Sequence, residues 1–245
     1  MNPVLILARN NLELTKRTIG SVLDQDVSVE IFVIDNDSTD DTVAWLEYQK
    51  ISYAKYSPQI GVSAGWNRGL YHWFAHYGAE HVLVLNNDVA LPRWFYGELL
   101  CYKEQAPFVT GVAIDDPKCV EWETGPPEMP LVPYPDFSAF LIFREAWEAL
   151  GDFDERMKFY SSDQDYHIRG WFKGVLMAKA NVPYYHIPSA TLRNAGAAER
   201  DEINRQADKD RAVLREKWGV SAGGEDYLAL FSPENYGRDK VEYVD

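Results

Sequence analysis

Acidic and amide residues that directly follow an apolar run are the first candidates for chemistry in this chain. The run from His81 to Leu85 is largely aliphatic, and Asn86, Asn87 and Asp88 follow it at once. A buried strand with this ending places the polar side chains at the carboxyl edge of a sheet, where open α/β folds bind their ligands. Because hard cations prefer carboxylate and phosphate oxygens, Asp88 is the first candidate for a metal-binding or phosphate-handling residue. The alternative interpretation is a simple turn, which Asn and Asp also favour.

Three further polar clusters are expected at the same edge of the sheet. Two apolar runs, residues 4–8 and 29–34, each end in charged or amide side chains, and a glycine-rich turn at residues 61–69 supplies backbone amides. Several clusters that converge on one edge favour a nucleotide site over isolated turns. The candidate nucleotide-binding residues are Ala8, Arg9, Asn10, Asp35, Asn36, Gly61, Asn67, Asn86 and Asn87. The glycine spacing fits neither the dinucleotide-binding nor the P-loop pattern, so dehydrogenase and kinase functions lose support.

Two aspartates in the second half of the chain are candidates for acid–base work. Asp163 and Asp165 lie two residues apart near a helix start, so they cannot share a helical face. One of them can point into a cleft while the other caps the helix, and the alternative is that both are caps. His186 follows two tyrosines, and a lone histidine of this kind is more often structural than a ligand.

The elements that must position these residues alternate along the chain. Strands are expected at residues 4–8, 29–34, 51–56, 81–85, 108–114, 137–143 and 175–180. One helix is expected from residue 12, and a second after a capping box formed by Ser38 and Asp41. Further helices are expected over residues 61–77, 92–104, 144–150, 161–173 and 198–218. This alternation predicts an α/β fold with a mainly parallel sheet and right-handed crossovers.

Composition further limits the classes of protein to which the chain can belong. The chain has 245 residues and no linker is evident, so we expect one domain over residues 1–245, with parts at 1–114, 115–190 and 191–245. The net charge of −14 argues against a broad nucleic-acid footprint. No apolar run approaches the roughly 20 residues that span a bilayer. We therefore expect a soluble cytoplasmic protein without an integral membrane segment, or one of the host cytoplasm if the chain is viral.

An ordered set of motifs resembles a known family. The motifs are the segments Val33–Asp40, Ile60–Gly69, Val84–Asp88, Phe137–Ile142, Gly151–Glu155 and Tyr160–Tyr166. Together they resemble the family-2 glycosyltransferases of the GT-A fold, including rhamnosyltransferase-like members, and the resemblance covers about residues 3–190. It implies a Rossmann-like nucleotide-sugar half, residues 1–114, followed by an acceptor-side catalytic half, residues 115–190, and a C-terminal helix and tail.

The resemblance also implies roles for individual residues on the donor side. Asp35 would contact the base and Asn67 would lie near the nucleotide. Residues 86–88 take the place of the family's Asp-x-Asp motif, with Asp88 linked to the diphosphate through Mn²⁺ or Mg²⁺. Asn86 stands where that motif has its first aspartate. His186 lies close to where the family often has a histidine that contacts metal or phosphate.

On the acceptor side, the resemblance matches Asp163 to the aspartate of a Glu-Asp pair, the general base that deprotonates the acceptor hydroxyl. Ser162 replaces the glutamate of that pair, which leaves Asp165 as the alternative base. An inverting displacement needs one such carboxylate and electrostatic help at the leaving group.

The expected function is therefore an inverting, metal-dependent transfer of a hexose or deoxyhexose from a nucleotide diphosphate sugar to an acceptor hydroxyl. The acceptor would be a glycan, a lipid-linked saccharide or another hydroxyl, and the acidic charge disfavours a modified DNA base. One alternative is a nucleotidyltransferase, but residues 8–11 are not the glycine-rich phosphate loop that it would need. The other is an inactive, glycosyltransferase-like binding module, suggested by Asn86 and Ser162.

Overall fold

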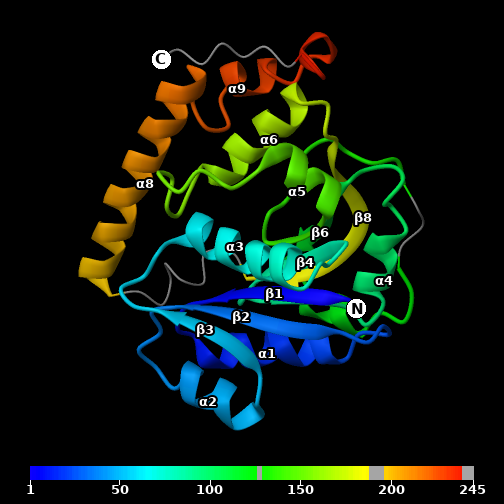
Figure 1. The fold of residues 1–245 in the computed structure, drawn as a ribbon, viewed down its shortest axis with the longest axis vertical. Helices are drawn as coiled ribbons and strands as arrows, with labels where there is room; N and C mark the ends of the chain where they lie inside the picture. The colour runs from blue at the N-terminus through cyan, green and yellow to red at the C-terminus, as the bar shows by residue number, and fades with distance from the viewer. Residues whose placement is uncertain (126–128, 188–195, 239–245) are drawn as a thin grey trace.

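A computed structural model, which describes residues 1–125, 129–187 and 196–238, shows a central sheet between two layers of helices (Figure 1). In this part of the chain one mixed sheet has the strand order β3-β2-β1-β4-β7-β6-β8-β5. The strands are β1 (Pro3–Ala8), β2 (Glu30–Asn36), β3 (Ser52–Tyr56), β4 (His81–Asn86), β5 (Val89–Ala90), β6 (Phe108–Ile114), β7 (Ala139–Phe143) and β8 (Met177–His186).

Most of the strands run in one direction, as the sequence predicts. β1 pairs in parallel with both β2 and β4, β2 with β3, and β6 with β8. β7 runs the opposite way between β4 and β6, and the short β5 is antiparallel to β8. The carboxyl ends of β1, β2 and β4 therefore meet at one edge, as the positions of the polar clusters require.

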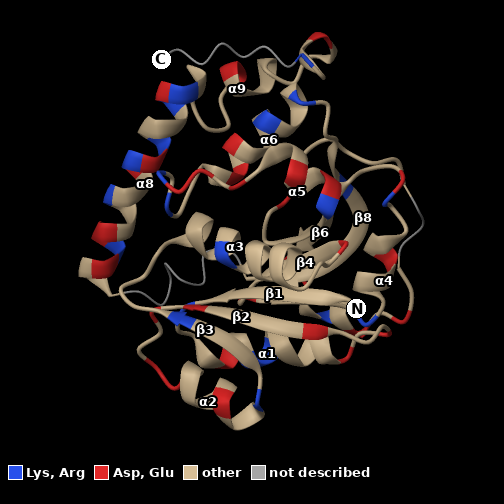
Figure 2. Cartoon of the chain, in the orientation of Figure 1, with Lys and Arg blue, Asp and Glu red and all other residues tan. Residues whose placement is uncertain are grey.

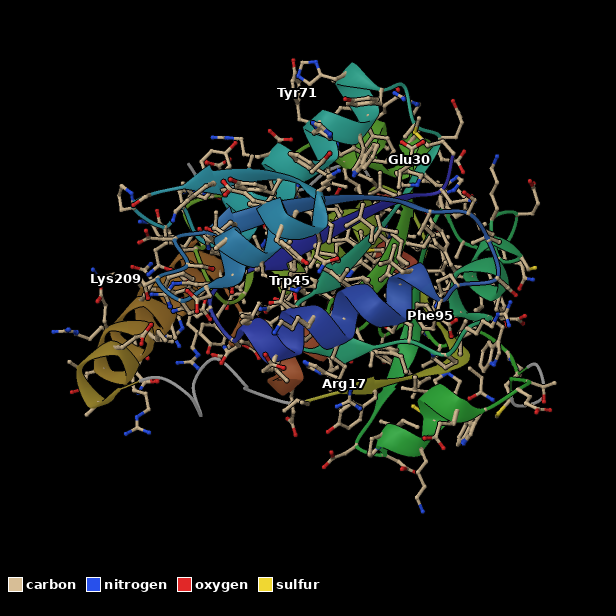
Figure 3. The ribbon with its side chains drawn as sticks, turned by 90° about the horizontal axis from the view of Figure 1, so that it is seen from below. Arg17, Glu30, Trp45, Tyr71, Phe95 and Lys209 are labelled. Atoms are coloured by element: carbon tan, nitrogen blue, oxygen red, sulfur yellow. The ribbon has the colours of Figure 1, made fainter. Side chains whose placement is uncertain are left out.

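Side chains along β1 alternate between two hydrophobic cores, one on each face of the sheet. Val4 and Ile6 face one core together with α1 (Leu12–Leu23), α2 (Thr42–Gln49) and α4 (Phe95–Leu100). Leu5 and Leu7 face the other core, which contains side chains from α3 (Val62–Tyr71), α5 (Arg144–Leu150) and α6 (Ser162–Phe172). Seen from below, α1 with Arg17 and α2 with Trp45 cover the near face of the sheet (Figure 3). Apolar residues at every position of β1 are thus explained by burial on both faces.

Several element boundaries differ from the predictions. The helix predicted over residues 61–77 is α3 followed by a π-helical turn, η1 (His72–His76), and the helix predicted over 92–104 is reduced to α4. The strand predicted to end at residue 180 is the ten-residue β8, which continues past a register shift against β6 and pairs with β5. The extension of β8 matters for function because it carries His186 to the carboxyl end of β4.

The C-terminal part of the described chain packs against α6. The predicted amphipathic helix is α8 (Ala197–Trp218), along which acidic and basic side chains alternate (Figure 2). Leu214 of α8 packs with Ile168 of α6 and with Tyr227 of α9 (Glu225–Ala229). The C-terminal tail, in which the sequence shows little periodicity, thus contains α9 and the short helical turn η3 (Pro233–Asn235). The 3₁₀ turn η2 (Pro117–Glu121) follows β6 in a proline-rich segment, residues 115–136. The division of the chain at residues 114 and 190 remains a prediction.

Among the described residues, no helix has the length and apolar character that crossing a lipid bilayer would demand.

The close approach of α3 to β1 depends on glycine. A Cβ added at Gly69 would lie 2.2 Å from Leu5 Cδ1 and 2.8 Å from Leu5 Cγ, and Leu5 is fully buried. We expect Gly69→Ala to lower the free energy of unfolding by about 1–3 kcal/mol, because overpacking must displace the helix or the strand. Denaturant titration measures this change.

The matched control is Gly20→Ala in α1, where the added Cβ meets no atom within 4 Å. That substitution should raise the free energy of unfolding by about 0.5–1 kcal/mol, through helix propensity alone. Equal stability of the two variants would contradict the account of the α3–β1 contact.

Candidate functional site

A cavity of about 290 Å³ opens at the carboxyl ends of β1, β2 and β4. Its lining consists of Leu7, Ala8, Arg9, Asn36, Gln59, Val62, Asn86, Asn87, Asp88, Phe159, Tyr160, His186 and Ile203. Seven of the residues predicted from the sequence are therefore brought together here. Within the described part of the chain, the other predicted site residues lie outside the lining: Asn10, Asp35, Gly61, Asn67, Asp163 and Asp165.

Asp88 and His186 meet in the wall of this cavity. The antiparallel pairing of β5 with β8 aligns Val89 with His186, and the amide of Ile187 donates to the carbonyl oxygen of Asp88. As a result, His186 Nε2 lies 3.5 Å from Asp88 Oδ1, which is too long for a strong hydrogen bond. Asp88 Oδ1 is itself buried and accepts no hydrogen bond from the described residues. A buried, unpaired carboxylate oxygen is costly unless a ligand completes it.

The ionisation of His186 reflects its acidic neighbours. Burial lowers the pKa of the imidazole, but the contact with Asp88, the charge of Asp88 and the charge of Asp136 outweigh burial and raise it above its ordinary value. The negative charges of Asp88 and Asp136 therefore outweigh burial in the electrostatic environment of the imidazole.

The donor set of this pair fits a hard divalent cation. An aspartate oxygen and an imidazole nitrogen are both ligands that Mn²⁺ accepts, and phosphate oxygens suit it equally. The described residues contain no group of three or more histidine, cysteine or acidic side chains placed to hold a metal. Asp88 and His186 would therefore need oxygens of a bound diphosphate, or water, to complete the coordination.

Amide side chains shape the edge around this pair. Asn87 Nδ2 donates to the carbonyl oxygen of Asn10 at 3.0 Å and to Thr15 Oγ1 at 2.9 Å. Asn36 Oδ1 accepts the amide of Ile60 at 2.8 Å. These bonds cross from one strand end to the next, so Asn36 and Asn87 hold the edge together as well as line the cavity.

Asp35 lies directly beneath this edge. Its carboxylate is fully buried, and Oδ1 accepts the amide of Ser38 at 3.2 Å, while Oδ2 has no hydrogen-bond partner among the described residues. The Ser38 hydroxyl accepts the amide of Asn10 instead of capping α2, so the predicted capping box is wrong. The serine is used to join the ends of β1 and β2.

Backbone strain is concentrated at this edge. Asn10, Asn11, Asp37 and Ser161 have positive φ values of 55°, 59°, 74° and 67°. Such conformations cost free energy in residues other than glycine, and they persist where the surrounding structure fixes a functional geometry. The first three follow β1 and β2, and Ser161 immediately precedes α6.

Asn67 and Gly61 serve the site indirectly. Asn67 is buried, its Nδ2 donates to the carbonyl oxygen of Phe153 and to Glu155 Oε1, and its Oδ1 accepts the amide of Phe153. These bonds tie α3 to the turn before α6. Gly61 has φ +94°, and a Cβ there would lie 2.8 Å from the carbonyl oxygen of Lys158. Glycine is thus required where α3 begins against that loop.

The first turns of α8 form part of the cavity wall, which the sequence did not indicate. Ile203 lines the cavity, and Glu199 Oε1 pairs with Arg9 Nη1 at 2.5 Å. A surface-like amphipathic pattern gives no sign of such a role. Phe159 and Tyr160 were also missed, because they belong to an irregular loop between two helices.

The two candidate bases have different surroundings. Asp165 is fully buried, and its oxygens accept from Arg169 Nε at 2.9 Å, Lys217 Nζ at 2.7 Å and Trp218 Nε1 at 2.8 Å. Asp163 is half-buried at the start of α6 and makes no ion pair with any described residue. Asp165 is therefore occupied in holding α8 against α6, whereas Asp163 is available for chemistry.

Asp163 lies in an acidic neighbourhood. Burial is the main cause that raises the pKa of its carboxyl, and the charge of Asp136 adds to it, whereas the amides of Asp163 and Gln164 oppose the shift. Asp136 also raises the pKa of His186, so it lies within electrostatic range of both groups. Asp136 Oδ1 accepts from the amide and hydroxyl of Ser138. This third carboxylate lies in the proline-rich loop, where the sequence predicted no site residue.

The fold and the cavity define an α/β protein with a polar cavity at the carboxyl ends of its parallel strands. The sequence profile of glycosyl transferase family 2 matches residues 4–169. The chain therefore belongs to this family, whose members transfer a sugar from a nucleotide sugar. Membership favours the expected transferase over the nucleotidyltransferase alternative. No curated protein sequence matches the chain.

Solved structures share the fold. The mannosyltransferase PcManGT from Pyrobaculum calidifontis, in complex with GDP-Man and Mn²⁺, has a TM-score of 0.60 at 15% identity, over 96% of this chain and 68% of that one. S. aureus TarS has a TM-score of 0.59 at 13% identity, over 96% of this chain and 50% of TarS. The structure of TarS residues 1–349 in complex with UDP-GlcNAc has a TM-score of 0.58 at 13% identity, over 94% of this chain and 78% of that one. The expected GT-A fold is confirmed, and the chain spans half the length of TarS.

The contrast between the two aspartates predicts different effects on stability. Asp165→Asn leaves Arg169 and Lys217, which are only 10% and 13% exposed, without their buried anion. We expect it to lower the free energy of unfolding by about 3–5 kcal/mol. Asp163→Asn is the matched control and should stay within about 0.5 kcal/mol of wild type. Chemical denaturation of both variants checks this, and equal losses would show that Asp163 is structural too.

Proposed function

We propose that this chain is an inverting, metal-dependent glycosyltransferase that moves a sugar from a nucleoside diphosphate donor to an acceptor hydroxyl. The observation that carries the proposal is the buried Oδ1 of Asp88, which accepts no hydrogen bond from the described residues and lies 3.5 Å from His186 Nε2 in the cavity at the strand ends. A cation held there would lie where the diphosphate of a nucleotide sugar binds in an open α/β fold.

In this proposal the Asp88 carboxylate and the His186 imidazole hold a divalent cation together with diphosphate oxygens. When bound, the cation would neutralise the negative charge that develops on the leaving diphosphate. Asn36, Asn86 and Asn87 line the same cavity and provide uncharged hydrogen-bonding groups for the donor. Asn86 in place of a carboxylate leaves the site with one negative charge fewer.

Asp163 is the proposed general base. It has no competing cation among the described residues, whereas Asp165 is fully engaged. The raised pKa of Asp163, caused mainly by burial, makes its carboxylate a stronger base than that of an ordinary aspartate. It would take the proton of the acceptor hydroxyl as that oxygen attacks the anomeric carbon and the diphosphate departs.

Two structural neighbours support the donor class. PcManGT was solved with GDP-Man and Mn²⁺, and TarS residues 1–349 with UDP-GlcNAc. We therefore propose a guanosine or uridine diphosphate sugar as donor, with hexoses and deoxyhexoses such as rhamnose in the panel to be tested. A glycan or lipid-linked saccharide is the proposed acceptor, because the net charge of −14 disfavours DNA.

The metal role predicts a specific loss in Asp88→Ala. Mn²⁺ should strengthen the binding of UDP or GDP to wild type, because the nucleotide diphosphate completes the coordination of the cation. Without the Asp88 carboxylate, this gain should fall by at least about tenfold. Thermal shift measures it, since a ligand that binds the folded state raises the melting temperature by mass action.

Asp115→Ala is the control for this experiment, because Asp115 is an exposed carboxylate outside the cavity lining. It should retain the full Mn²⁺ effect. Equal Mn²⁺ dependence in wild type and Asp88→Ala would rule out the proposed metal site.

The base role predicts a loss of turnover without a loss of binding in Asp163→Asn. We expect kcat to fall by about 10²- to 10⁴-fold while the affinity for the nucleotide stays unchanged. Because the pKa of Asp163 is raised, the acid limb of kcat in wild type should lie above the pKa of an ordinary aspartate, and activity should rise with pH through it. The pH profile of sugar transfer measures this limb.

Wild-type activity in Asp163→Asn would assign the base elsewhere. A wild-type chain that binds nucleotide with Mn²⁺ but transfers no sugar from any donor in the panel would instead support the inactive binding module.

A further inference from the structure

Asp210 is a fully buried carboxylate in the middle of α8, outside the residues that the family profile matches. Its neighbours Asp208 and Lys209 are exposed, and Lys209 extends outward from the helix in Figure 3. A carboxylate that faces inward on such a helix must be satisfied by specific donors, because burial of an unpaired charge is very costly.

Three consecutive backbone amides satisfy Asp210. Oδ1 accepts the amide of Lys158 at 3.1 Å, and Oδ2 accepts the amides of Phe159 at 2.8 Å and Tyr160 at 3.0 Å. Gln206 Nε2 adds a fourth bond to Oδ1 at 2.7 Å. The loop thus wraps its amides around one side chain, which lies 50 to 52 residues away in the sequence.

This loop is a wall of the donor cavity. Phe159 and Tyr160 line the cavity, and the carbonyl oxygen of Lys158 accepts the amide of Val62 at 2.6 Å, where α3 begins. The loop is therefore clamped on one side by α3 and on the other by Asp210. Without the carboxylate, its three amides would lose their acceptors and the wall would have no fixed position relative to the strand ends.

We propose that Asp210 is a positioning residue that fixes the 158–160 wall of the cavity and thereby sets the affinity for the nucleotide part of the donor. This inference rests on the proposed function, because it takes the cavity to be the donor site. Asp210 touches neither donor nor acceptor in this account and acts only through the loop.

The effect of Asp210 should be separable from that of the base. Asp163 lies on α6, which is fixed to α8 independently through Asp165, Lys217 and Trp218. A change at Asp210 should therefore weaken nucleotide binding more than it lowers kcat.

The test is Asp210→Asn in the full chain, titrated calorimetrically with UDP and with GDP in the presence of Mn²⁺. The new Nδ2 would face amides that also donate, so the loop must move. We expect the Kd of the nucleotide that wild type binds to rise about tenfold, with unchanged stoichiometry. Asp208→Asn, on the exposed face of the same turn, should leave Kd unchanged.

A purely structural role would lower the stoichiometry or the melting temperature and leave Kd as in wild type, and that result would overturn the proposal. Hydrogen exchange gives a second readout, because the amides of residues 158–160 should lose protection while those of α6 keep it. If Asp210→Asn does not fold, Gln206→Ala weakens the same cluster without removing the charge. A rise in Kd of about two- to threefold would then support the proposal, and an unchanged Kd would overturn it.

The failure of this inference differs from failure of the proposed function. If wild type binds neither nucleotide under any metal condition, the donor site itself is wrong. If wild type binds one of them and Asp210→Asn binds it equally well, the function stands and only the role of Asp210 falls.

Discussion

The buried ion cluster around Asp165 is the interaction on which the site depends. One carboxylate accepts from Arg169, Lys217 and Trp218, and it joins the helix that carries Asp163 to the last turn of α8. Burial of such a cluster is favourable only when every charge is paired and hydrogen-bonded, and removal of one partner leaves the others uncompensated. The cluster therefore fixes α8 firmly in one place, whatever its net contribution to stability.

The position of α8 brings three further groups to the cavity or to its wall. Glu199 pairs with Arg9, Ile203 lines the cavity, and Asp210 binds the amides of the 158–160 loop. A helix that would otherwise be a cover for the domain thus completes the wall of the site. The surroundings of the carboxylates differ: Asp165 and Asp210 each accept several hydrogen bonds and hold segments together, whereas Asp88 Oδ1 accepts none from the described residues and Asp163 makes no ion pair with them.

Sequence reasoning located the strands and the Asp88 end of the site because these depend on local patterns. β1, β2 and β4 are buried on both faces, and a run of aliphatic residues that ends in polar ones is visible without a structure. Residues near the strand ends converged as expected, since parallel strands bring their carboxyl ends to one edge. His186 also joined Asp88, although the strand that carries it was predicted to end six residues too early.

The rest of the site depends on contacts between segments far apart in the chain. Nothing in the local sequence distinguishes Asp163 from Asp165, because the distinction comes from Lys217 and Trp218 more than 50 residues later. Asn67 has the residue type of a ligand group but is used to hold the turn at Phe153. Asp210 looks like one of many charges on an exposed helix, and only the packing of α8 turns it inward.

The configuration of the transferred sugar tests the central claim most directly. In the proposed mechanism Asp163 acts as a base and the acceptor oxygen attacks the anomeric carbon directly, which inverts its configuration. Proton NMR of the product, taken before it can equilibrate, should therefore show the anomeric configuration opposite to that of the donor. Retention of the donor configuration would contradict the account, because retention needs a second displacement, whereas the proposed mechanism has a single direct attack.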